Sequence, residues 1–265
     1  MPPCVARFPQ FTAPTVNTGV YGCYNGTPPR TGSEEDRTLQ QPTVLVIIPA
    51  LNEVETIGTV LDEIPYMDLQ DKGYRVRVLV VDNGSSDGTP NVVRRKGAEL
   101  RREERRGKGF AMRHAFEQES ADYVFMLDGD ATYPATHLPE MLAVLEADHD
   151  VVIGSRLKGN RAPGSISLLN VIGNQILTLF ACLLYRRRIS DLCTGYWGFR
   201  GDVLPQLELT ARGFTLEAEL FSEVARHNLT LGEVPIHYRR RPTPTKLRSL
   251  RDGAKIARTL IRKRS

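Results

Sequence analysis

Cysteine and histidine, which build most disulfide frameworks, zinc sites and thiol active sites, are scarce in this sequence. Its four cysteines, Cys4, Cys23, Cys182 and Cys193, are irregularly spaced, and this spacing predicts neither a disulfide framework nor a zinc site. None of the five histidines has a metal-ligand spacing, so we expect structural histidines rather than ligands. The composition therefore fits a protein of the reducing cytosol.

Several catalytic motifs are absent as well. The sequence has no Gly-x-x-x-x-Gly-Lys-Ser/Thr string and no Gly-x-Ser-x-Gly string, which excludes a P-loop and the nucleophile elbow of the α/β-hydrolases. Residues 1–42 lack the charged start and the apolar core of a signal peptide. They carry prolines, glycines and small polar residues without an apolar period, so we expect a flexible tail there.

Acidic residues are scarce at the C-terminal end of the chain, where Asp252 is the one acid among many cations. These cations are Arg239, Arg240, Arg241, Lys246, Arg248, Arg251, Lys255, Arg258, Arg262, Lys263 and Arg264. Basic runs of this kind occur in proteins that bind nucleic acid and in proteins that bind anionic membranes. Because the sequence shows no RNA- or DNA-binding motif and no aromatic residues interleaved with the cations, we expect no nucleic acid partner.

What the chain does contain is a regular alternation of strands and helices. With 265 residues, 41% hydrophobic and 25% charged, it fits one large α/β domain. Apolar runs predict strands at residues 44–48, 76–81, 98–101, 123–127, 151–156 and 234–238. Helical spacing predicts helices at residues 53–64, 109–119 and 136–147, the first burying Val54, Ile57, Val60, Leu61 and Ile64. The alternation predicts a doubly wound, mostly parallel sheet.

Polar clusters follow three of the predicted strands, at residues 49–53, 82–84 and 128–130. Right-handed crossovers bring the carboxyl ends of parallel strands to one edge of the sheet, so we expect the three clusters to meet in one crevice. In the third, Asp128 and Asp130 flank Gly129 and offer hard oxygen ligands to Mg²⁺ or Mn²⁺, which in turn can hold a substrate diphosphate. The alternative for this tripeptide is a surface turn.

A Gly-Lys-Gly string at residues 107–109 opens the second predicted helix. Amide N–H groups at a helix start, together with the Lys108 ammonium, can face a diphosphate. A simple solvated helix start is the equal alternative.

Five stretches, taken in order, resemble one family: residues 48–53, 80–89, 106–109, 128–130 and 154–156. They resemble family 2 glycosyltransferases with the GT-A fold, and within them the dolichyl-phosphate mannosyltransferase and glucosyltransferase group. The resemblance covers residues 43–250, which we expect to form a GT-A domain between the tail of residues 1–42 and a basic amphipathic helix at residues 251–265. It implies a nucleotide-sugar donor, a divalent metal (Mg²⁺ or Mn²⁺), inversion at the anomeric carbon and a polyprenyl phosphate acceptor.

The resemblance also implies roles for individual residues on the donor side. Nucleotide-sugar contacts would come from Pro49, Leu51, Glu53, Asp82, Lys108, Asp128, Gly129, Asp130 and Thr132. Asp128 and Asp130 would hold the metal and act in catalysis, and Thr132 stands where the mannosyltransferases often have Gln. The pair Asp82-Asn83 favours UDP-glucose or UDP-N-acetylglucosamine as donor, with GDP-mannose possible.

On the acceptor side, the resemblance implies that catalytic Arg156 meets the donor diphosphate or the acceptor phosphate. Arg241 and Lys246 belong to a stretch similar to the family's phosphate-binding loop. Residues 191–200 resemble the stretch that closes over sugar and acceptor. A phosphate acceptor is already ionised and requires no strong base; a soluble enzyme acting on a hydroxyl acceptor is the alternative, and its base would be Glu217 or Glu219.

Two segments predict contact with a membrane. Residues 166–185 are strongly apolar and end at Arg186, Arg187 and Arg188, but Asn170, Asn174 and Gln175 argue against a full span. A core helix is possible, and an interfacial helix is favoured. The C-terminal helix carries an apolar stripe of Leu250, Ile256, Leu260 and Ile261 beside its cations. We therefore expect peripheral association with the cytoplasmic face of an anionic membrane.

Overall fold

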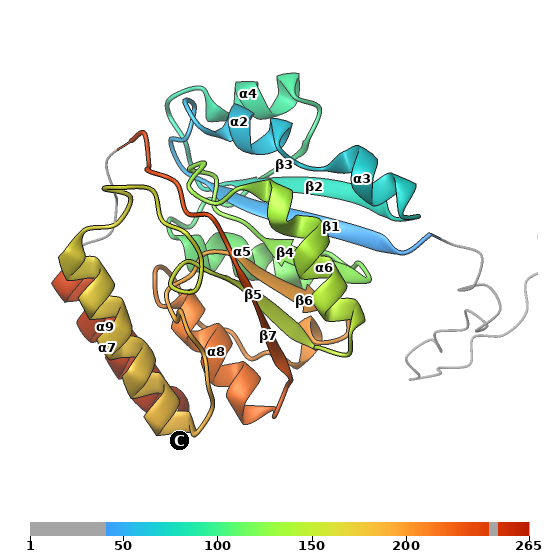
Figure 1. Ribbon diagram of the computed structural model, residues 1–265. Helices are drawn as coiled ribbons and strands as arrows, with labels where there is room; N and C mark the ends of the chain where they lie inside the picture. Colours follow the sequence, from blue (N-terminus) through green and yellow to red (C-terminus); the bar gives the residue numbers. More distant parts are fainter. Residues whose placement is uncertain (1–40, 244–248, 265) are drawn as a thin grey trace, which may run out of the picture. The chain divides into compact units, whose positions relative to one another are not determined.

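The computed structural model describes residues 41–243 and 249–264, and residues 1–40 of the predicted tail and Lys246 lie outside them. Within these residues, seven strands form one sheet in the order β3-β2-β1-β4-β6-β5-β7 (Figure 1). They are β1 (Thr43–Ala50), β2 (Arg75–Asp82), β3 (Glu99–Arg102), β4 (Tyr123–Met126), β5 (Val151–Ser155), β6 (Trp197–Arg200) and β7 (Leu231–Pro235). Among the described strands, β6 alone runs antiparallel to its neighbours. The predicted doubly wound, mostly parallel sheet is confirmed.

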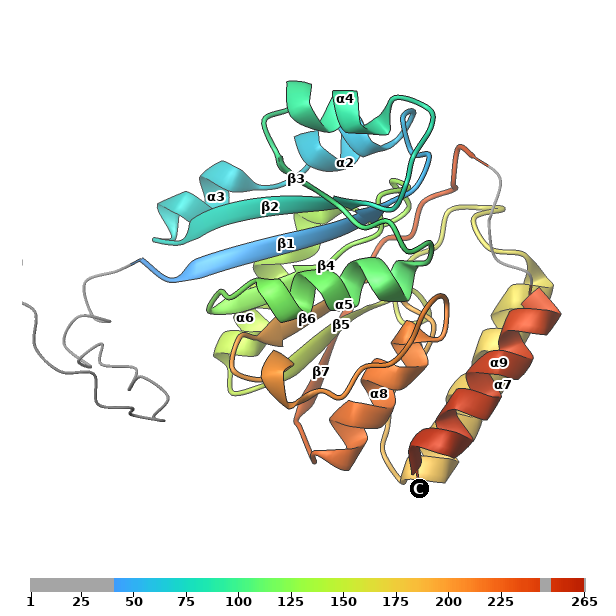
Figure 2. The ribbon, with the colours of Figure 1, turned by 180° about the vertical axis from the view of Figure 1, so that it is seen from behind.

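Helices cover both faces of the sheet because its central strands are apolar on both sides. In β1, Val44, Val46 and Ile48 join one core, and Leu45 and Ile47 join the other. The first core is covered by α2 (Ile57–Asp62), α3 (Tyr66–Asp71), α4 (Thr89–Arg95) and α6 (Leu138–Glu146). The second is covered by α5 (Lys108–Gln118) and α8 (Leu216–Arg226), with α7 (Leu168–Tyr185) and α9 (Ser249–Arg264) beside α8 (Figures 1 and 2). Short 3-10 turns occur at Ala135–His137 and Leu204–Gln206.

The first predicted helix begins later than expected, at Ile57. The backbone N–H groups of Glu53 and Val54 donate instead to Thr89 Oγ1 and Asp87 Oδ2, which holds this turn against the next loop. The prediction that Val54 is buried is therefore wrong, since it is 37% exposed, whereas Ile57 is fully buried as predicted. Val60, Leu61 and Ile64 are buried as well.

Sequence patterns missed β6 altogether. Residues 191–200 were expected to close over the substrates, but Trp197–Arg200 forms a central strand between β4 and β5. Trp197 is fully buried and stacks on Phe199. The predicted last strand also ends early, at Pro235, because the chain then leaves β5 and Tyr238 pairs with Arg161.

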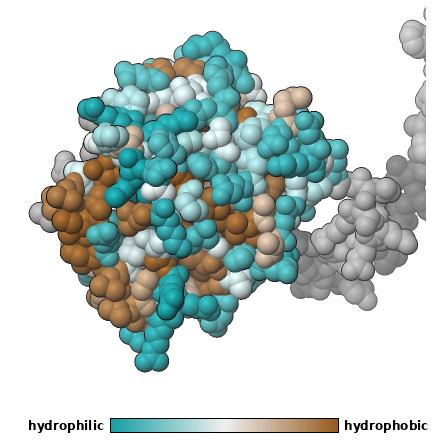
Figure 3. Space-filling view, in the orientation of Figure 1, coloured by the Kyte–Doolittle hydropathy of each residue, from teal (hydrophilic) through white to brown (hydrophobic). Residues whose placement is uncertain are grey.

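Helix α7 has an unusual distribution of side chains. Its buried positions are Asn174, Thr178 and Ala181. Its large exposed apolar residues are Leu168, Leu169, Ile172, Ile176, Leu179 and Leu183, and Figure 3 shows hydrophobic surface gathered over this helix. By length and composition alone α7 is apolar enough to cross a membrane, with a mean hydropathy of 1.7. The structure, however, lays it along α9.

In helix α9, the apolar side that was predicted to be free is turned toward the protein. Ile256 and Leu260 are buried in the core formed with α8, so the prediction that they make a free apolar stripe is wrong. Ile261 is 56% exposed, and the side chain of Leu250 lies outside the described residues. The exposed side of α9 is instead cationic, with Arg251, Lys255, Arg258 and Arg262. The free apolar surface therefore belongs to α7, and α9 supplies charge beside it.

A buried ammonium fastens α9 to the domain. Lys263 Nζ lies 3.0 Å from Glu219 Oε1 and 3.3 Å from Glu223 Oε1, two carboxylates of α8 that are fully buried. It also donates to the carbonyl of Glu208. Charges removed from water to this extent require their partner, because an uncompensated buried charge is strongly destabilising.

We predict that Lys263→Ala lowers the free energy of unfolding by about 3–5 kcal/mol, the usual cost of breaking a buried ion pair. Lys255→Ala is the matched control on the same helix, since the Lys255 side chain is 56% exposed in its pair with Asp252 and a pair with a solvated ammonium contributes about 1 kcal/mol or less. Urea unfolding of both variants measures the difference. Equal, small losses would show that Lys263 does not anchor α9.

Candidate active site

The three predicted polar clusters meet at one edge of the sheet. Ala50 is in register with Asp82, and Leu127 N–H donates to Ile47 O at 3.0 Å, so β1, β2 and β4 end together. Pro49, the penultimate residue of β1, and Leu51, the first residue after the strand, are half-buried. The three clusters thus lie together in the loops at the ends of β1, β2 and β4.

Side chains join these loops to one another. Asn52, at a φ of 52°, accepts Ser86 N–H on its side-chain oxygen at 2.8 Å, and its own N–H donates to Ser85 Oγ at 2.9 Å. Thr56 Oγ1 donates to the carbonyl of Gly129 at 2.8 Å. Asp82 is buried, and its Oδ1 accepts the Ser85 N–H at 3.2 Å. Hydrogen bonds therefore join the loops that follow β1, β2 and β4.

Asn83 has a structural role that its sequence context did not reveal. Its amide donates to the carbonyls of Glu103 (3.1 Å) and Arg105 (2.7 Å), and its oxygen accepts the N–H of Gly107. The buried amide thus shapes the loop that leads into α5. An Asn directly after a buried strand was the available signal, since its side chain can replace backbone partners in a turn.

The Gly-Lys-Gly string is explained by close packing against residues 211–213. Gly107 has a φ of +134°, and a Cβ there would collide with the carbonyl of Arg212. A Cβ on Gly109 would collide with the carbonyl of Ala211. This approach places Lys108 Nζ 2.6 Å from both Asp128 Oδ1 and Glu217 Oε1. The side chain of Lys108 is only 12% exposed, so the alternative of a solvated helix start is wrong.

Two carboxylates after β4 are each matched by a cation. Burial opposes the charge on Lys108, but Asp128 and Glu217 outweigh it and raise the pKa of Lys108 above its ordinary value. Arg241 lies between Glu53 Oε1 (2.8 Å) and Asp130 Oδ2 (3.2 Å). Burial, with Asp128 nearby, raises the pKa of Asp130 despite its bonds to Thr132 and Arg241. At this edge, therefore, Lys108 lies between Asp128 and Glu217, and Arg241 lies between Glu53 and Asp130.

The donor set fits a cation that is shared with a substrate. Thr132 Oγ1 donates to Asp130 Oδ1 at 2.6 Å, which turns this hydroxyl toward the carboxylate. Within the described residues, no group of three or more His, Cys, Asp or Glu side chains is suited to a metal ion. Mg²⁺ is commonly held by one or two carboxylates with substrate phosphates and water completing the shell. Asp128 and Asp130 meet that pattern rather than that of an all-protein metal cage.

Arg156 forms a buried, two-pronged ion pair with Asp191. Its Nε and Nη2 donate to Asp191 Oδ2 and Oδ1, both at 2.7 Å. Its guanidinium also lies over the rings of Tyr238 (5.4 Å) and Tyr133 (6.0 Å). Burial raises the pKa of a carboxyl, but Arg156 outweighs that effect and keeps the pKa of Asp191 below its ordinary value. Arg156, the predicted phosphate contact, is therefore charged and held in one orientation.

Of the two glutamates offered as a base, Glu219 has a structural task. It is fully buried and accepts Thr210 N–H (2.8 Å), Ala211 N–H (2.6 Å) and the Thr210 hydroxyl (2.6 Å). The suggestion that Glu219 acts as a base is therefore wrong. Glu217 lies near the site, but its Oε1 accepts the ammonium of Lys108.

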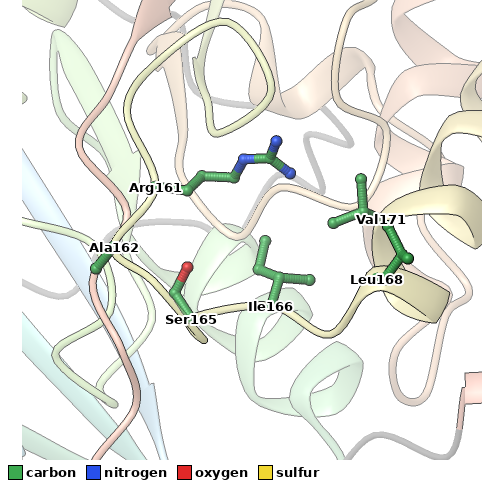
Figure 4. A pocket seen from close by; sticks show the side chains of 6 residues that line it. All are labelled: Arg161, Ala162, Ser165, Ile166, Leu168 and Val171. Atoms are coloured by element: carbon green, nitrogen blue, oxygen red, sulfur yellow. The ribbon is translucent and has the colours of Figure 1, made fainter.

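A cavity of about 300 Å³ lies between the loop after β5 and the start of α7. It is lined by Arg161, Ala162, Ser165, Ile166, Leu168 and Val171 (Figure 4). Figure 4 shows the Arg161 side chain reaching from the loop toward α7, with Ile166 below it. Ala162 N–H donates to the carbonyl of Tyr238 at 2.9 Å, which ties this loop to the residue beneath Arg156.

The sheet order and the carboxylate edge define a GT-A glycosyltransferase architecture. The family model for glycosyl transferase family 2 matches residues 45–207, and the chain belongs to this family of glycosyltransferases. The resemblance seen in the motifs is confirmed.

Individual relatives agree with this assignment. The glycosyltransferase AglJ of Haloferax volcanii is 37% identical over 83% of this chain and 71% of its own length. A dolichyl-phosphate hexose transferase of the same organism is 33% identical over 82% of this chain and 92% of its own. Glucosyl-3-phosphoglycerate synthase from Mycobacterium tuberculosis, solved with Mn²⁺, UDP and glucosyl-3-phosphoglycerate, has a TM-score of 0.63 at 24% identity, over 84% of this chain and 78% of its own. That structure shows the fold alone.

Gly195 tests the geometry of the carboxylate edge. A Cβ at this position would collide with Asp128 Oδ2, the free end of a side chain that can shift. We predict that Gly195→Ala displaces this carboxylate and lowers kcat/KM by about a hundredfold, as misplacement near 1 Å can do, while the midpoint of thermal unfolding changes little. Gly173→Ala, which meets nothing within 4 Å, is the matched control. Wild-type activity in Gly195→Ala would contradict a role for Asp128 in the reaction.

Proposed function

We propose that this glycosyltransferase transfers a hexose, with inversion, from a nucleotide sugar to a polyprenyl phosphate at a membrane surface. The observation that carries the proposal is the placement of an exposed apolar helix face beside a site of carboxylates and a buried arginine. The named activity of the Haloferax volcanii dolichyl-phosphate hexose transferase, which aligns over 92% of its length, supports the same acceptor class.

On the donor side, the nucleotide lies among the loops after β1 and β2. Asp82 hydrogen-bonds the base or the ribose, and Pro49, Leu51 and Glu53 line the nucleotide pocket. UDP-glucose and UDP-N-acetylglucosamine are the favoured donors, and GDP-mannose is the further candidate. Lys108 and Arg241, each held by carboxylates, supply positive charge beside Asp128 and Asp130.

Asp128 and Asp130 would hold Mg²⁺ or Mn²⁺ together with the donor diphosphate. When bound, such an ion neutralises charge on the departing nucleoside diphosphate. The chain's own contribution is to orient the carboxylates: Thr132 and Arg241 fix Asp130, and Lys108 fixes Asp128. Preorganised charges of this kind stabilise a transition state without having to reorganise during the reaction.

The acceptor phosphate would meet Arg156, with Lys246 as a further contact by resemblance. A phosphate monoester is largely ionised near neutral pH, since its second pKa lies near 6. Its oxygen therefore attacks the anomeric carbon directly, and the leaving diphosphate departs from the opposite face, which inverts the configuration. The protein's task is alignment of the two reacting atoms.

A hydroxyl acceptor would need a base within hydrogen-bonding reach. Glu219 is committed to the loop at residues 210–211 and to Lys263, and Glu217 is paired with Lys108. The arrangement of charges therefore favours an acceptor that is already ionised.

A donor and acceptor screen tests the function. Purified protein is incubated with each nucleotide sugar, a polyprenyl phosphate and Mg²⁺ or Mn²⁺, and the lipid-linked sugar is measured. We predict transfer to the phosphate acceptor that stops on chelation with EDTA and returns with added metal, and no transfer to the corresponding polyprenyl alcohol. Transfer to the alcohol at an equal rate would contradict the phosphate acceptor.

The membrane contact that we propose is the exposed apolar face of α7. Arg186 and Arg188 follow this face and are exposed, and α9 presents Arg251, Lys255, Arg258 and Arg262 next to α7. Each cation near an anionic bilayer contributes roughly 1 kcal/mol. A second copy of the chain on this face would bring like charges together, so an anionic lipid surface fits it better. We infer peripheral binding at the cytoplasmic face.

We predict that Ile176→Glu weakens binding to vesicles of anionic phospholipid and slows transfer to a long-chain acceptor, because it places a charge within the apolar face. Ile176 is 62% exposed, so the fold tolerates the change. Met67→Glu is the matched control, since Met67 on α3 is 70% exposed away from α7. Vesicle sedimentation at low and high salt measures binding. Equal binding of both variants would exclude α7 as the contact.

A further inference from the structure

Helix α7 reverses the usual arrangement of a surface helix, which buries its apolar side. Asn174 and Thr178 are buried, at 9% and 8% exposure, while leucines and isoleucines face outward. Buried polar side chains are retained where they have hydrogen-bond partners. The partners of Asn174 and Thr178 therefore show what the inner face of α7 contacts.

Both side chains bind the segment that carries Asp191. Asn174 Nδ2 donates to Asp191 Oδ1 at 2.6 Å, and Asn174 Oδ1 accepts Cys193 N–H at 3.3 Å. Thr178 Oγ1 accepts Leu192 N–H at 3.1 Å and lies 3.4 Å from Asn174 Oδ1. These bonds fasten the inner face of α7 to residues 191–193.

Asp191 transmits this contact to Arg156. The carboxylate is fully buried, and its Oδ1 accepts both from Asn174 Nδ2 and from Arg156 Nη2. Its Oδ2 accepts from Nε and from the backbone N–H of Arg156. The side-chain rotation of Asp191 thus decides the plane of the guanidinium, and Asn174 holds that rotation through a bond to the same Oδ1 that accepts Arg156 Nη2. Networks of this kind in a low-dielectric interior are sensitive to the loss of one member.

We propose that Asn174 is a positioning residue for the acceptor phosphate, acting through Asp191 on the guanidinium of Arg156. The inference rests on the proposed function, in which Arg156 faces that phosphate. The helix whose outer face meets the lipid surface thereby also orients the phosphate-binding group with its inner face.

The first test is Asn174→Leu, which keeps the side-chain volume and removes the hydrogen bonds. Loss of a bond to a charged group predicts a rise of roughly tenfold in the acceptor KM for farnesyl phosphate, with the nucleotide-sugar KM unchanged. Gln175→Ala, one residue along and exposed, is the matched control and should match wild type. A folded Asn174→Leu protein with a wild-type acceptor KM overturns the inference, and so does an equal rise in both KM values.

A double-mutant cycle separates positioning from a general structural effect. Calorimetry measures the Kd of farnesyl phosphate for wild type, Asn174→Leu, Arg156→Lys and the double variant. Lys cannot form the two-pronged bond to Asp191, so Asn174→Leu should weaken binding little further in that background. Independent, additive losses would overturn the inference, since residues acting through one another are non-additive.

Thr178→Val is a second variant should Asn174→Leu not fold, because it removes one hydroxyl and keeps the shape. It should raise the acceptor KM in the same selective way and to a smaller extent; an unchanged value overturns the inference. Wild-type protein that uses no polyprenyl phosphate would overturn the proposed function and the inference together. Wild-type protein that transfers normally, with variants indistinguishable from it, overturns the inference alone.

Discussion

The buried ion pair between Arg156 and Asp191 is the interaction on which the proposed acceptor side of this structure depends. Removing both charges from water costs several kcal/mol for each ion, and only close geometry with further hydrogen bonds offsets that cost. Arg156 comes from the end of β5, and Asp191 from the segment before β6. Asn174 supplies the additional bond from α7, and the rings of Tyr133 and Tyr238 flank the guanidinium. One pair therefore joins the sheet, the β6 segment and the surface helix.

The proposed donor side follows a different rule, in which Asp128 and Asp130 are each met by a cation from a distant element. Lys108 reaches Asp128 because Gly107 and Gly109 let α5 approach the backbone at residues 211 and 212. Arg241 reaches Asp130 and Glu53 from beyond β7. Each of these two cations is shared between two acids, so negative charge remains at the edge, an arrangement suited to a divalent cation bound with a diphosphate.

Short-range patterns in the sequence were sufficient for the parallel core and for the convergence of the loops after β1, β2 and β4. The runs that became β1 and β4 are continuous and apolar, the run that became β2 is interrupted only by Arg77, and the polar residues after all three stand out. The same reasoning missed β6, because Trp197–Arg200 is four residues long and contains a glycine. The position of β6 between β4 and β5 depends on pairing between distant parts of the chain, which local periodicity does not predict. Asn83 and Asn174 were missed as organisers for a related reason, since their partners lie 20 or more and 17 residues away.

The two amphipathic helices show why a periodic pattern alone does not predict what each face of a helix contacts. An apolar stripe predicts burial against something apolar, and it does not say whether that is protein or lipid. On α9 the stripe of Ile256 and Leu260 meets α8, and Lys263 closes over two buried glutamates. On α7, Asn174, one of the three polar residues that interrupt the apolar run, turns inward together with Thr178, and the leucines are left outside. Asn174 and Thr178 make their hydrogen bonds within the domain, so the inner face of α7 satisfies its buried polar groups without water. The outer face, which we propose to meet lipid, then presents mainly leucines and isoleucines.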